Sequence, residues 1–346
     1  MKRGLALIAA ALVALTAVAA AGAKGTDTTI SGAGSTFVAP LVSTWTPALG
    51  RAFGYTIQYS AVGSGAGIAA ITNKQVDFGA SDAPLSSTQA QACGDCVQIP
   101  WVLAATTVAY NVPGAPVHLK LDGATIANMF LGKITNWNDR AIAKLNPGAN
   151  MPNLKITPVF RSDGSGTSYN FTDYLSSVSA AWKAKVGTAS TTPAFPAGVG
   201  AKGSGGVAGV VKQTPGGVTY VDTAYALTNH IKFAAVKNAA GKYVYPSLVN
   251  IIAAANSLKS VPSGNEVHIV NPSKANPAAY PICTYTYIIM HRSTPHAAEL
   301  RKMVYWALTQ GQQGTYTAKL LFASMAKTKS KAVLVAAEKT LKTVHA

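Results

Sequence analysis

The stretch ITPVFRSDGSGTS, residues 156–168, joins an apolar strand pattern to the start of a helix. Residues 156–160 predict a buried strand, and beyond the loop Phe171, Leu175 and Val178 recur at helical spacing. A strand followed directly by a turn and a helix is typical of an α/β protein. The stretch therefore places small polar residues at the point where a helix begins.

These small residues predict a site for a small oxyanion. Ser165, Gly166 and Thr167 fall at the helix N-terminus, where unpaired backbone N–H groups and the positive end of the helix dipole attract anions. The two hydroxyls can add donors, Gly166 lets a ligand approach the backbone, and Arg161 supplies a permanently charged fork. A solvated loop with Ser or Thr capping the helix is the alternative, and this segment alone does not decide between the two.

Three further turns carry the same chemistry at the ends of predicted strands. They are SGAGSTF at residues 31–37, VGSGAG at 62–67, and VDFGASDAP at 76–84, a buried strand that ends on Asp82. Taken singly, each could be a tight turn. Phe37 stands where a dinucleotide fingerprint needs its third Gly, and the chain has no nucleotide-type phosphate loop. Ligands of open α/β sheets bind outside the carboxyl ends of strands, so we expect the four turns to meet.

The order of elements predicts two lobes. Strands and helices alternate over residues 28–91, and the apolar strand 99–110 then leads into a second lobe that holds the Arg161 loop. A second apolar strand at 285–291 returns to the first lobe, and helices follow at about 297–310 and 331–342. The Gly-rich segment 197–217 is predicted to form flexible turns. Two crossings would form a hinge, with the four turns facing each other across a cleft.

The first 23 residues have the pattern of a secretory signal peptide. Lys2 and Arg3 precede an apolar stretch at residues 5–20 that is short for a membrane span, and small residues at 21–23 predict cleavage after Ala23. There is no Cys near this point, so a lipid anchor is not indicated. No later segment is apolar for long enough to cross a bilayer. We therefore expect a soluble protein outside the cytoplasm.

The net charge of +17 in 346 residues raises the possibility of a nucleic-acid partner. Loss of Lys2 and Arg3 with the signal peptide lowers it by two, to +15. The Lys residues are scattered, apart from Lys327, Lys329 and Lys331, and no aromatic-plus-basic stripe appears. Only 12% of residues are charged and 49% are hydrophobic, which suits a close-packed α/β protein. A general attraction of small anions is favoured over nucleic-acid recognition.

Cys93 and Cys96 form the motif CGDC, which in an oxidising compartment predicts a short local disulfide. A redox-active pair is the alternative, although such a pair normally lies at a helix start in a thioredoxin-like unit, which this sequence lacks. A zinc site would need further ligands at matched spacing, and none stands out in the sequence. Cys283, in the apolar run 280–290, is predicted to be a buried free thiol.

With these motifs together, the sequence resembles the periplasmic phosphate-binding protein of the Pst-type ABC uptake system, a type II solute-binding protein. The motifs are GAGSTF at 32–37, VGSG at 62–65, VDFGASDAPL at 76–85 and RSDGSGTS at 161–168. The similarity extends over about residues 28–225 and 281–310. It implies a two-lobed α/β fold, each lobe a mixed sheet flanked by helices, joined by a two-strand hinge. We expect lobe I at 24–107 plus 286–346 and lobe II at 108–285.

The resemblance also implies a set of phosphate ligands and one supporting residue, Asp163, which would hold Arg161 in place. The ligands would be Thr36, Phe37, Ser64, Asp82, Arg161, Ser165, Gly166 and Thr167. The implied function is delivery of inorganic phosphate to a membrane ABC permease by a monomeric protein without cofactor, metal or catalytic residue. Ser35, Val38 and the loop of Cys93 and Cys96 depart from the pattern of many relatives, and residues 310–346 match it poorly.

Asp82 decides which oxyanion the site would accept. An ionised carboxylate only accepts hydrogen bonds, so it needs a ligand that carries a proton. Hydrogen phosphate carries one and sulfate at neutral pH does not. A site built around one buried hydrogen bond can reject an analogue that lacks it by about 10⁴ to 10⁵. A structural role for Asp82, as the cap of the helix that follows Pro84, is the alternative.

Two other classes of function compete with this prediction. A phosphate-ester hydrolase could use Ser64 or Ser165 as its nucleophile, but it would need a base, and no His lies in the four turns. No carboxylate cluster for two metal ions is visible in the sequence either. The remaining alternative is a binding protein for another oxyanion, or an extracellular anion-dependent adhesin. The six His residues are His118, His230, His268, His291, His296 and His345.

Overall fold

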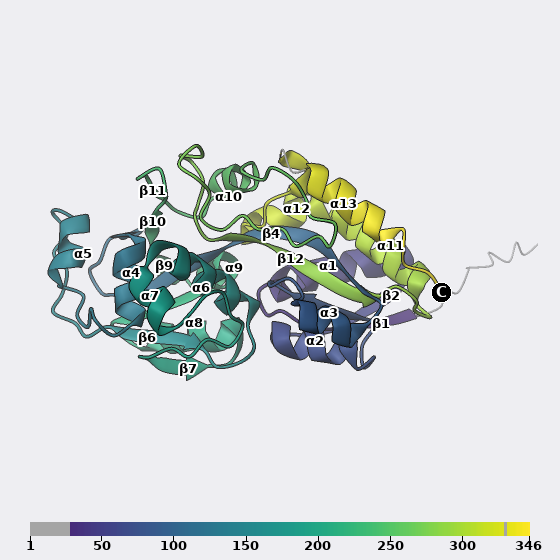
Figure 1. Ribbon diagram of the computed structural model, residues 1–346, viewed down its shortest axis with the longest axis horizontal. Coiled ribbons are helices and arrows are strands. Elements are labelled where there is room, and N and C mark those ends of the chain that lie inside the picture. Colours follow the sequence, from purple (N-terminus) through teal and green to yellow (C-terminus); the bar gives the residue numbers. More distant parts are fainter. Residues whose placement is uncertain (1–27, 329–330) are drawn as a thin grey trace, which may run out of the picture.

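The computed structural model describes residues 28–328 and 331–346, so the predicted signal peptide at 1–23 lies outside the described residues. A nine-stranded mixed sheet forms the framework, in the order β2-β1-β3-β12-β4-β8-β6-β7, with β9 beside β4 (Figure 1). Its strands are β1 (Thr28–Gly34), β2 (Tyr55–Ser60), β3 (Phe78–Ser81), β4 (Cys96–Asn111), β6 (Thr157–Arg161), β7 (Val199–Ala201), β8 (Gly217–Asp222), β9 (Lys232–Phe233) and β12 (Cys283–His291). A small second sheet contains β11 (Tyr243–Val244), β10 (Ala235–Lys237) and β5 (Lys120–Leu121).

Helices cover the strands on both sides of the molecule. The α-helices are α1 (Ala39–Phe53), α2 (Ser64–Thr72), α3 (Ser87–Cys93), α4 (Gly123–Phe130), α5 (Arg140–Leu145), α6 (Gly166–Val178), α7 (Ala180–Lys185), α8 (Gly203–Gln213), α9 (Thr223–Thr228), α10 (Leu248–Ala255), α11 (Ala297–Leu308), α12 (Gly314–Thr317) and α13 (Lys331–Leu341). Short 3₁₀ helices lie at Gln310–Gln312, Ala318–Leu320 and Met325–Lys327. Within the described residues, none of the helices has the length and apolarity that a bilayer crossing requires.

One long strand, β4, belongs to both halves of the sheet. Its first part, Cys96–Ala105, pairs antiparallel with β12, and its last part, Thr106–Asn111, pairs antiparallel with β8. The pairing partner therefore changes between Ala105 and Thr106. The Thr106 N–H donates to the carbonyl of Ile282, 2.9 Å away, so the chain returns beside the point where it first crossed.

The two halves are visible as separate groups in Figure 1. Strands β1 to β3, with α1 to α3 and the C-terminal helices α11 and α13, form the group on the right. Strands β6 and β7, with helices α4 to α8, form the group on the left. Strands β4 and β12 lie between these groups, and almost every residue of β4 is buried. A strand covered on both faces needs a near-continuous apolar sequence, which is the pattern that predicted it.

The residues of helix α1 explain where it begins and ends and which face it buries. Pro40 lies in the first turn of the helix, where a backbone N–H would have no partner within the helix. Gly54 ends the helix with a left-handed φ of 73°. Trp45, one of the buried residues of α1, packs against Trp101 with ring centroids 5.4 Å apart. The preceding strand β1 continues to Gly34.

The prediction of flexible turns over residues 197–217 was wrong. This segment contains β7 and the eleven-residue helix α8, Gly203–Gln213. Val207, Ala208 and Val211 are completely buried along one face of α8. The burial of this face outweighs the low helix propensity of the Gly residues, which was the only feature that the prediction used.

Replacement of Gly67 by Ala is expected to lower the free energy of unfolding by about 1–3 kcal/mol through overpacking. Helix α2 packs against β1 here, and a Cβ on Gly67 would overlap the Cα of Gly34 and lie 2.5 Å from the carbonyl oxygen of Ala33. Backbone atoms cannot move aside as a flexible side chain would. Gly209→Ala in α8 is the matched control, because a Cβ there has no neighbour within 4 Å. Equal denaturant midpoints for the two variants would contradict the close approach.

Candidate functional site

The four turns predicted from the sequence meet between the two halves of the sheet. The Gly65 N–H, from the turn after β2, donates to the carbonyl of Gly164 in the turn after β6, at 2.9 Å. The Gly166 N–H, at the start of α6, donates to Ser64 Oγ at 3.1 Å. Gly166 also packs directly on Asp82, since a Cβ at position 166 would lie 2.7 Å from the Asp82 Cβ. These contacts join the turns of β2 and β3 to the turn of β6.

A second bridge joins the turn after β1 to helix α8. Thr36 Oγ1 accepts a hydrogen bond from the Ser204 N–H at 3.0 Å and lies 2.9 Å from Ser204 Oγ. Both side chains are buried. With direct hydrogen bonds between its facing walls, the cleft is in a closed arrangement.

Arg161 provides a fixed positive charge on one wall of the cleft. Its side chain is buried, and Nε and Nη2 donate to the two carboxylate oxygens of Asp163 at 2.7 and 2.5 Å. Asp163 Oδ1 also accepts from the Gly203 N–H at 2.9 Å. Burial raises the pKa of Asp163, but the hydrogen bonds and charge of Arg161 outweigh it and hold that pKa below its ordinary value. The other edge of the guanidinium, at Nη1, is not bonded to Asp163 and lies 3.5 Å from Ser204 Oγ.

Asp82 is the buried acid of the facing wall, with 1% of its surface exposed. Its Oδ1 accepts from Ser35 Oγ at 2.5 Å, and its Oδ2 lies 3.5 Å from Ser64 Oγ. Burial raises the pKa of Asp82 to about 6, although the Ser35 hydrogen bond and the charge of Arg161 act in the opposite direction. At neutral pH this side chain is therefore mostly a carboxylate, and it becomes a neutral acid at mildly acidic pH.

The two hydroxyls at the start of α6 differ in their hydrogen bonding. Ser165 Oγ accepts from the Ser168 N–H at 3.1 Å, which is an N-cap bond, so the capping role considered for this segment is present. Thr167 Oγ1 is buried and has no hydrogen-bond partner among the described residues. A buried hydroxyl without a partner is costly, and a bound anion would satisfy it.

Phe37 and its neighbour Ser35 organise the turn after β1. The Phe37 N–H donates to Ser35 Oγ at 3.1 Å, and the Phe37 ring packs edge-on against Phe322 with centroids 6.1 Å apart. Ser35 Oγ thus accepts from the backbone while it donates to Asp82. The Phe37 N–H, which the resemblance assigns to the ligand, has an internal partner in this arrangement.

Three residues of the site were missed by the sequence reasoning, namely Ser35, Ser204 and Asp222. Ser35 was noted only as a departure from the family pattern, whereas it is the shortest contact of the Asp82 carboxylate. Asp222 ends β8 and caps α9, where its Oδ1 accepts from the Tyr225 N–H at 3.0 Å. Burial raises the pKa of Asp222 to about 8, against the hydrogen bonds from Tyr225 and Ser204, and the negative charge of Asp82 adds to the rise.

Signals for two of these residues were present in the sequence. Gly203-Ser204-Gly205 repeats the Gly63-Ser64-Gly65 pattern at a helix start, and Asp222 follows an apolar strand as Asp82 does. Because flexible turns were expected over 197–217, the Gly203-Ser204-Gly205 pattern was not interpreted as the start of a helix. For Ser35, no sequence signal identifies its contact with a residue 47 positions away.

The predicted disulfide pair lies outside this cleft. The structure joins the sulfurs of Cys93, the last residue of α3, and Cys96, the first residue of β4. Cys283 is a buried free thiol at the start of β12.

Comparison with protein families gives consistent matches over most of the chain. A family model described as a PBP superfamily domain matches residues 19–310. The phosphate-binding protein PstS of Xylella fastidiosa is 41% identical over 288 residues, which is 82% of this chain and 78% of that protein. The phosphate-binding protein PstS of Pasteurella multocida is 37% identical over 289 residues, 82% of this chain and 83% of its own.

Solved structures share the fold at lower sequence identity. A high-affinity periplasmic phosphate-binding protein, PfluDING, bound with phosphate superposes with a TM-score of 0.70 at 23% identity, over 88% of this chain and 92% of that one. A putative phosphate ABC transporter substrate-binding protein with bound phosphate, from Clostridium perfringens, gives a TM-score of 0.59 at 18% identity, over 86% and 99% of the two chains. These likenesses, with the superfamily match, confirm the predicted two-lobed α/β fold.

Proposed function

The chain belongs to the PstS family of phosphate-binding proteins within the PBP superfamily, and we propose that it binds inorganic phosphate in its cleft and delivers it to an ABC importer in the membrane. The observation that carries this proposal is the pairing of two buried groups of opposite function. Arg161 is a guanidinium held by Asp163, and Asp82 is an acceptor on the facing wall. An anion that also carries a proton can accept hydrogen bonds from Arg161 and donate one to Asp82.

Each predicted site residue has a place in this proposal. The Arg161 edge and the start of α6 supply positive potential, and the free hydroxyl of Thr167 donates to a phosphate oxygen. Ser64, which now bridges Gly166 and Asp82, turns its hydroxyl to the ligand. The remaining proposed contacts come from Thr36, Phe37, Ser165 and Gly166. For Thr36 and Phe37, ligand binding replaces the internal bonds to Ser204 and Ser35.

Binding requires the two walls to separate and close again, because the cleft residues are buried. We divide the lobes as the sequence predicts, with residues 24–107 and 286–346 forming one and 108–285 the other. The change of pairing partner between Ala105 and Thr106, and the return of the chain beside it at Ile282, support a hinge at this place. Closure around the ligand gives the permease a distinct shape to recognise, as in other hinge-closing binding proteins.

The protein belongs to a family of binding proteins and is not an enzyme. We propose that it acts outside the cytoplasm as a monomer, after removal of a signal peptide at residues 1–23. The serines considered as nucleophiles have structural partners that fit a binding site. Ser165 caps α6, and Ser64 Oγ accepts from the Gly166 and Asp82 N–H groups.

Calorimetric titration of phosphate-stripped protein with phosphate, sulfate and a phosphate monoester tests this function. At neutral pH we expect phosphate to bind in a one-to-one complex and sulfate to bind about 10⁴-fold or more weakly, since it leaves the Asp82 acceptor unpaired. The monoester should remain intact after prolonged incubation. Comparable affinities for phosphate and sulfate would show a general oxyanion receptor, and release of phosphate from the ester would show a hydrolase.

A further inference from the structure

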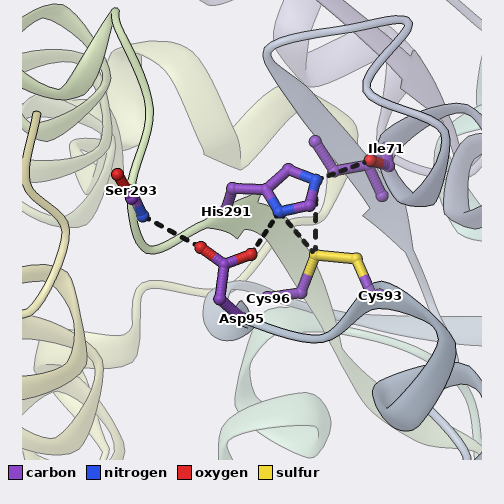
Figure 2. Close-up of a disulfide and its surroundings, with 6 residues drawn as sticks. All are labelled: Ile71, Cys93, Asp95, Cys96, His291 and Ser293. Carbon is purple, nitrogen blue, oxygen red and sulfur yellow. Dashed lines mark hydrogen bonds and ion pairs between the residues drawn. A yellow bond between two sulfur atoms is a disulfide. The ribbon is translucent and has the colours of Figure 1, made fainter.

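A second cluster of polar side chains surrounds the disulfide, where β4 begins and β12 ends (Figure 2). It contains Cys93, Cys96, Asp95 and His291, with His291 at the last position of β12 and paired with Cys96 of β4. Thr284, near the other end of β12, contacts the carbonyl of Asp82 at 3.4 Å. At about 3.3 Å per strand residue, the two sites are about 23 Å apart.

The ring of His291 has a defined orientation in this cluster. Its Nε2 lies 2.9 Å from the carbonyl oxygen of Ile71, which can only accept, so Nε2 carries a proton. The other ring nitrogen, Nδ1, lies 2.5 Å from Asp95 Oδ1 and 3.8 Å from Cys96 Sγ, and the same sulfur is 4.0 Å from Nε2. One nitrogen fixed on a backbone carbonyl, with the other turned toward acidic groups, is the orientation of a metal-ligating histidine.

In the disulfide form, His291 Nδ1 and Asp95 Oδ1 lie 2.5 Å apart, which is a hydrogen-bond distance and leaves no room for a metal ion between them. Coordination of a metal ion by Nδ1 therefore requires the Asp95 oxygen to move aside. The ring is buried, with 8% of the side chain exposed, while 45% of the Asp95 side chain is exposed. The exposed Asp95 side chain is therefore the member of the pair that can move away from Nδ1.

The spacing of the groups matches zinc coordination. One ligand atom from each of Cys93, Cys96 and His291 lies within 4.8 Å of the other two. A tetrahedral Zn²⁺ ion with Zn–S bonds of about 2.3 Å and Zn–N bonds of about 2.0 Å holds its ligand atoms about 3.3–3.8 Å apart. The Cys-x₂-Cys spacing is that of a structural zinc site, and His291 is the further ligand that the sequence pattern alone does not reveal.

We propose that this cluster is a Zn²⁺ site when Cys93 and Cys96 are reduced, with ligands Cys93 Sγ, Cys96 Sγ and His291 Nδ1. An Asp95 carboxylate oxygen takes the fourth position after it has moved away from Nδ1. Disulfide and zinc are then mutually exclusive states of one site. A reducing dithiol breaks the S–S bond by exchange, giving two protein thiols and its own disulfide. Zn²⁺ then displaces the two thiol protons, and the sulfurs move to about 3.8 Å apart around the ion.

The bound ion would join three segments that are distant in the sequence. Asp95 Oδ2 accepts from the Ser293 N–H at 3.1 Å, and the Arg292 N–H donates to the Asp95 carbonyl at 3.2 Å. His291 is anchored to Ile71 near the end of α2. Zinc binding should therefore stabilise the reduced form of this lobe, which has lost its covalent link between α3 and β4.

The test uses the mature chain reduced with a non-chelating phosphine, which becomes its oxide by taking oxygen from water as the disulfide becomes two thiols. We expect one equivalent of Zn²⁺ per reduced chain in competition with a chromophoric chelator, and a thiolate-to-metal charge-transfer band with Co²⁺. The oxidised chain should bind neither ion. Equal binding by the oxidised chain, or no stoichiometric binding by the reduced one, would overturn the proposal.

Variants separate this site from nonspecific thiol binding. Cys93→Ser should abolish stoichiometric binding, whereas Cys283→Ser should retain it, because that thiol lies outside the cluster. His291→Gln should weaken zinc affinity by at least about 100-fold, since loss of a mere outer partner already costs about 10–100-fold. Unchanged affinity in this variant would remove His291 from the site. Unaltered phosphate binding checks folding. If His291→Gln does not fold, Asp95→Asn decides: a loss of about tenfold or more supports the site, because water can take the fourth position, and unchanged zinc affinity would overturn the proposed coordination.

Discussion

Arg161→Ala should weaken phosphate binding by about 30-fold to several thousand-fold. Truncation of one member of a buried, hydrogen-bonded charge pair costs about 2–5 kcal/mol, and every 1.4 kcal/mol is a factor of ten. Two effects contribute here. The ligand loses its permanently charged donor, and the partly buried Asp163 loses both hydrogen bonds from Arg161 and keeps the one from the Gly203 N–H. Sulfate binding should fall by a similar factor, because both anions use this charge.

Two further variants isolate the contribution of geometry from that of charge. Arg140→Ala removes the same charge from the exposed start of α5. It should change phosphate affinity little, since charges exposed to solvent are screened by salt. Arg161→Lys keeps a charge but loses the planar fork on Asp163, so its affinity should lie between those of wild type and Arg161→Ala. Calorimetry gives the affinities and circular dichroism checks the fold. Wild-type affinity in Arg161→Ala would exclude Arg161 from the site.

Asp82→Asn should remove most of the discrimination against sulfate. In the wild type, sulfate brings its oxygens against a buried acceptor, and a preference for phosphate of about 10⁴ to 10⁵ is expected. The Asn side chain has nearly the same shape but offers an NH₂ donor, so it can bind an oxygen that carries no proton. Asp77→Asn is the matched control, because Asp77 bonds to Ser31 and His296 in the same lobe, outside the cleft. An unchanged phosphate-to-sulfate ratio in Asp82→Asn would assign Asp82 a structural role only.

Acidic pH should have the same effect on the wild-type protein as this substitution. Burial raises the pKa of Asp82 to about 6, so the protonated form, which can donate to sulfate, is scarce at neutral pH and predominant below that value. Sulfate affinity should therefore rise about tenfold per unit as pH falls from about 8 to 7, and level off below about 6. Asp82→Asn, without this proton, should show no such rise. The same slope in the variant would assign the pH effect to another group.

The sign of the corresponding effect on stability follows from the same shift. A carboxyl whose pKa is higher in the folded chain than in the unfolded chain favours the folded state most at low pH. The contribution of Asp82 is lost as pH rises through about 6, where the folded-state group ionises. The binding site therefore keeps a buried carboxylate at neutral pH at the expense of stability, which is common for groups that serve recognition.

The local elements could be predicted because neighbouring residues decide them. The apolar runs of β4 and β12, the Trp45 face of α1 and the strand that leads to Arg161 all follow from short-range periodicity. The donor-rich turns were identifiable for the same reason, since Gly, Ser and Thr at helix starts have a direct physical meaning. Helix α8 was missed because its Gly content, taken alone, disfavours a helix that tertiary burial stabilises.

The sequence by itself determined the four donor-rich turns, Arg161 with Asp163 two residues away, and the acid Asp82 at a strand end, because each rests on residues adjacent along the chain. Only the tertiary structure decided how these groups face each other and which residues support them. Ser35 reaches Asp82, and Ser204 reaches Thr36 across 168 positions, while His291 meets Cys96 from 195 positions away. Such contacts depend on sheet order and strand register, which pair β12 with β4 and bring β8 beside it. Local periodicity predicts that a strand exists, but packing against distant segments determines its partner.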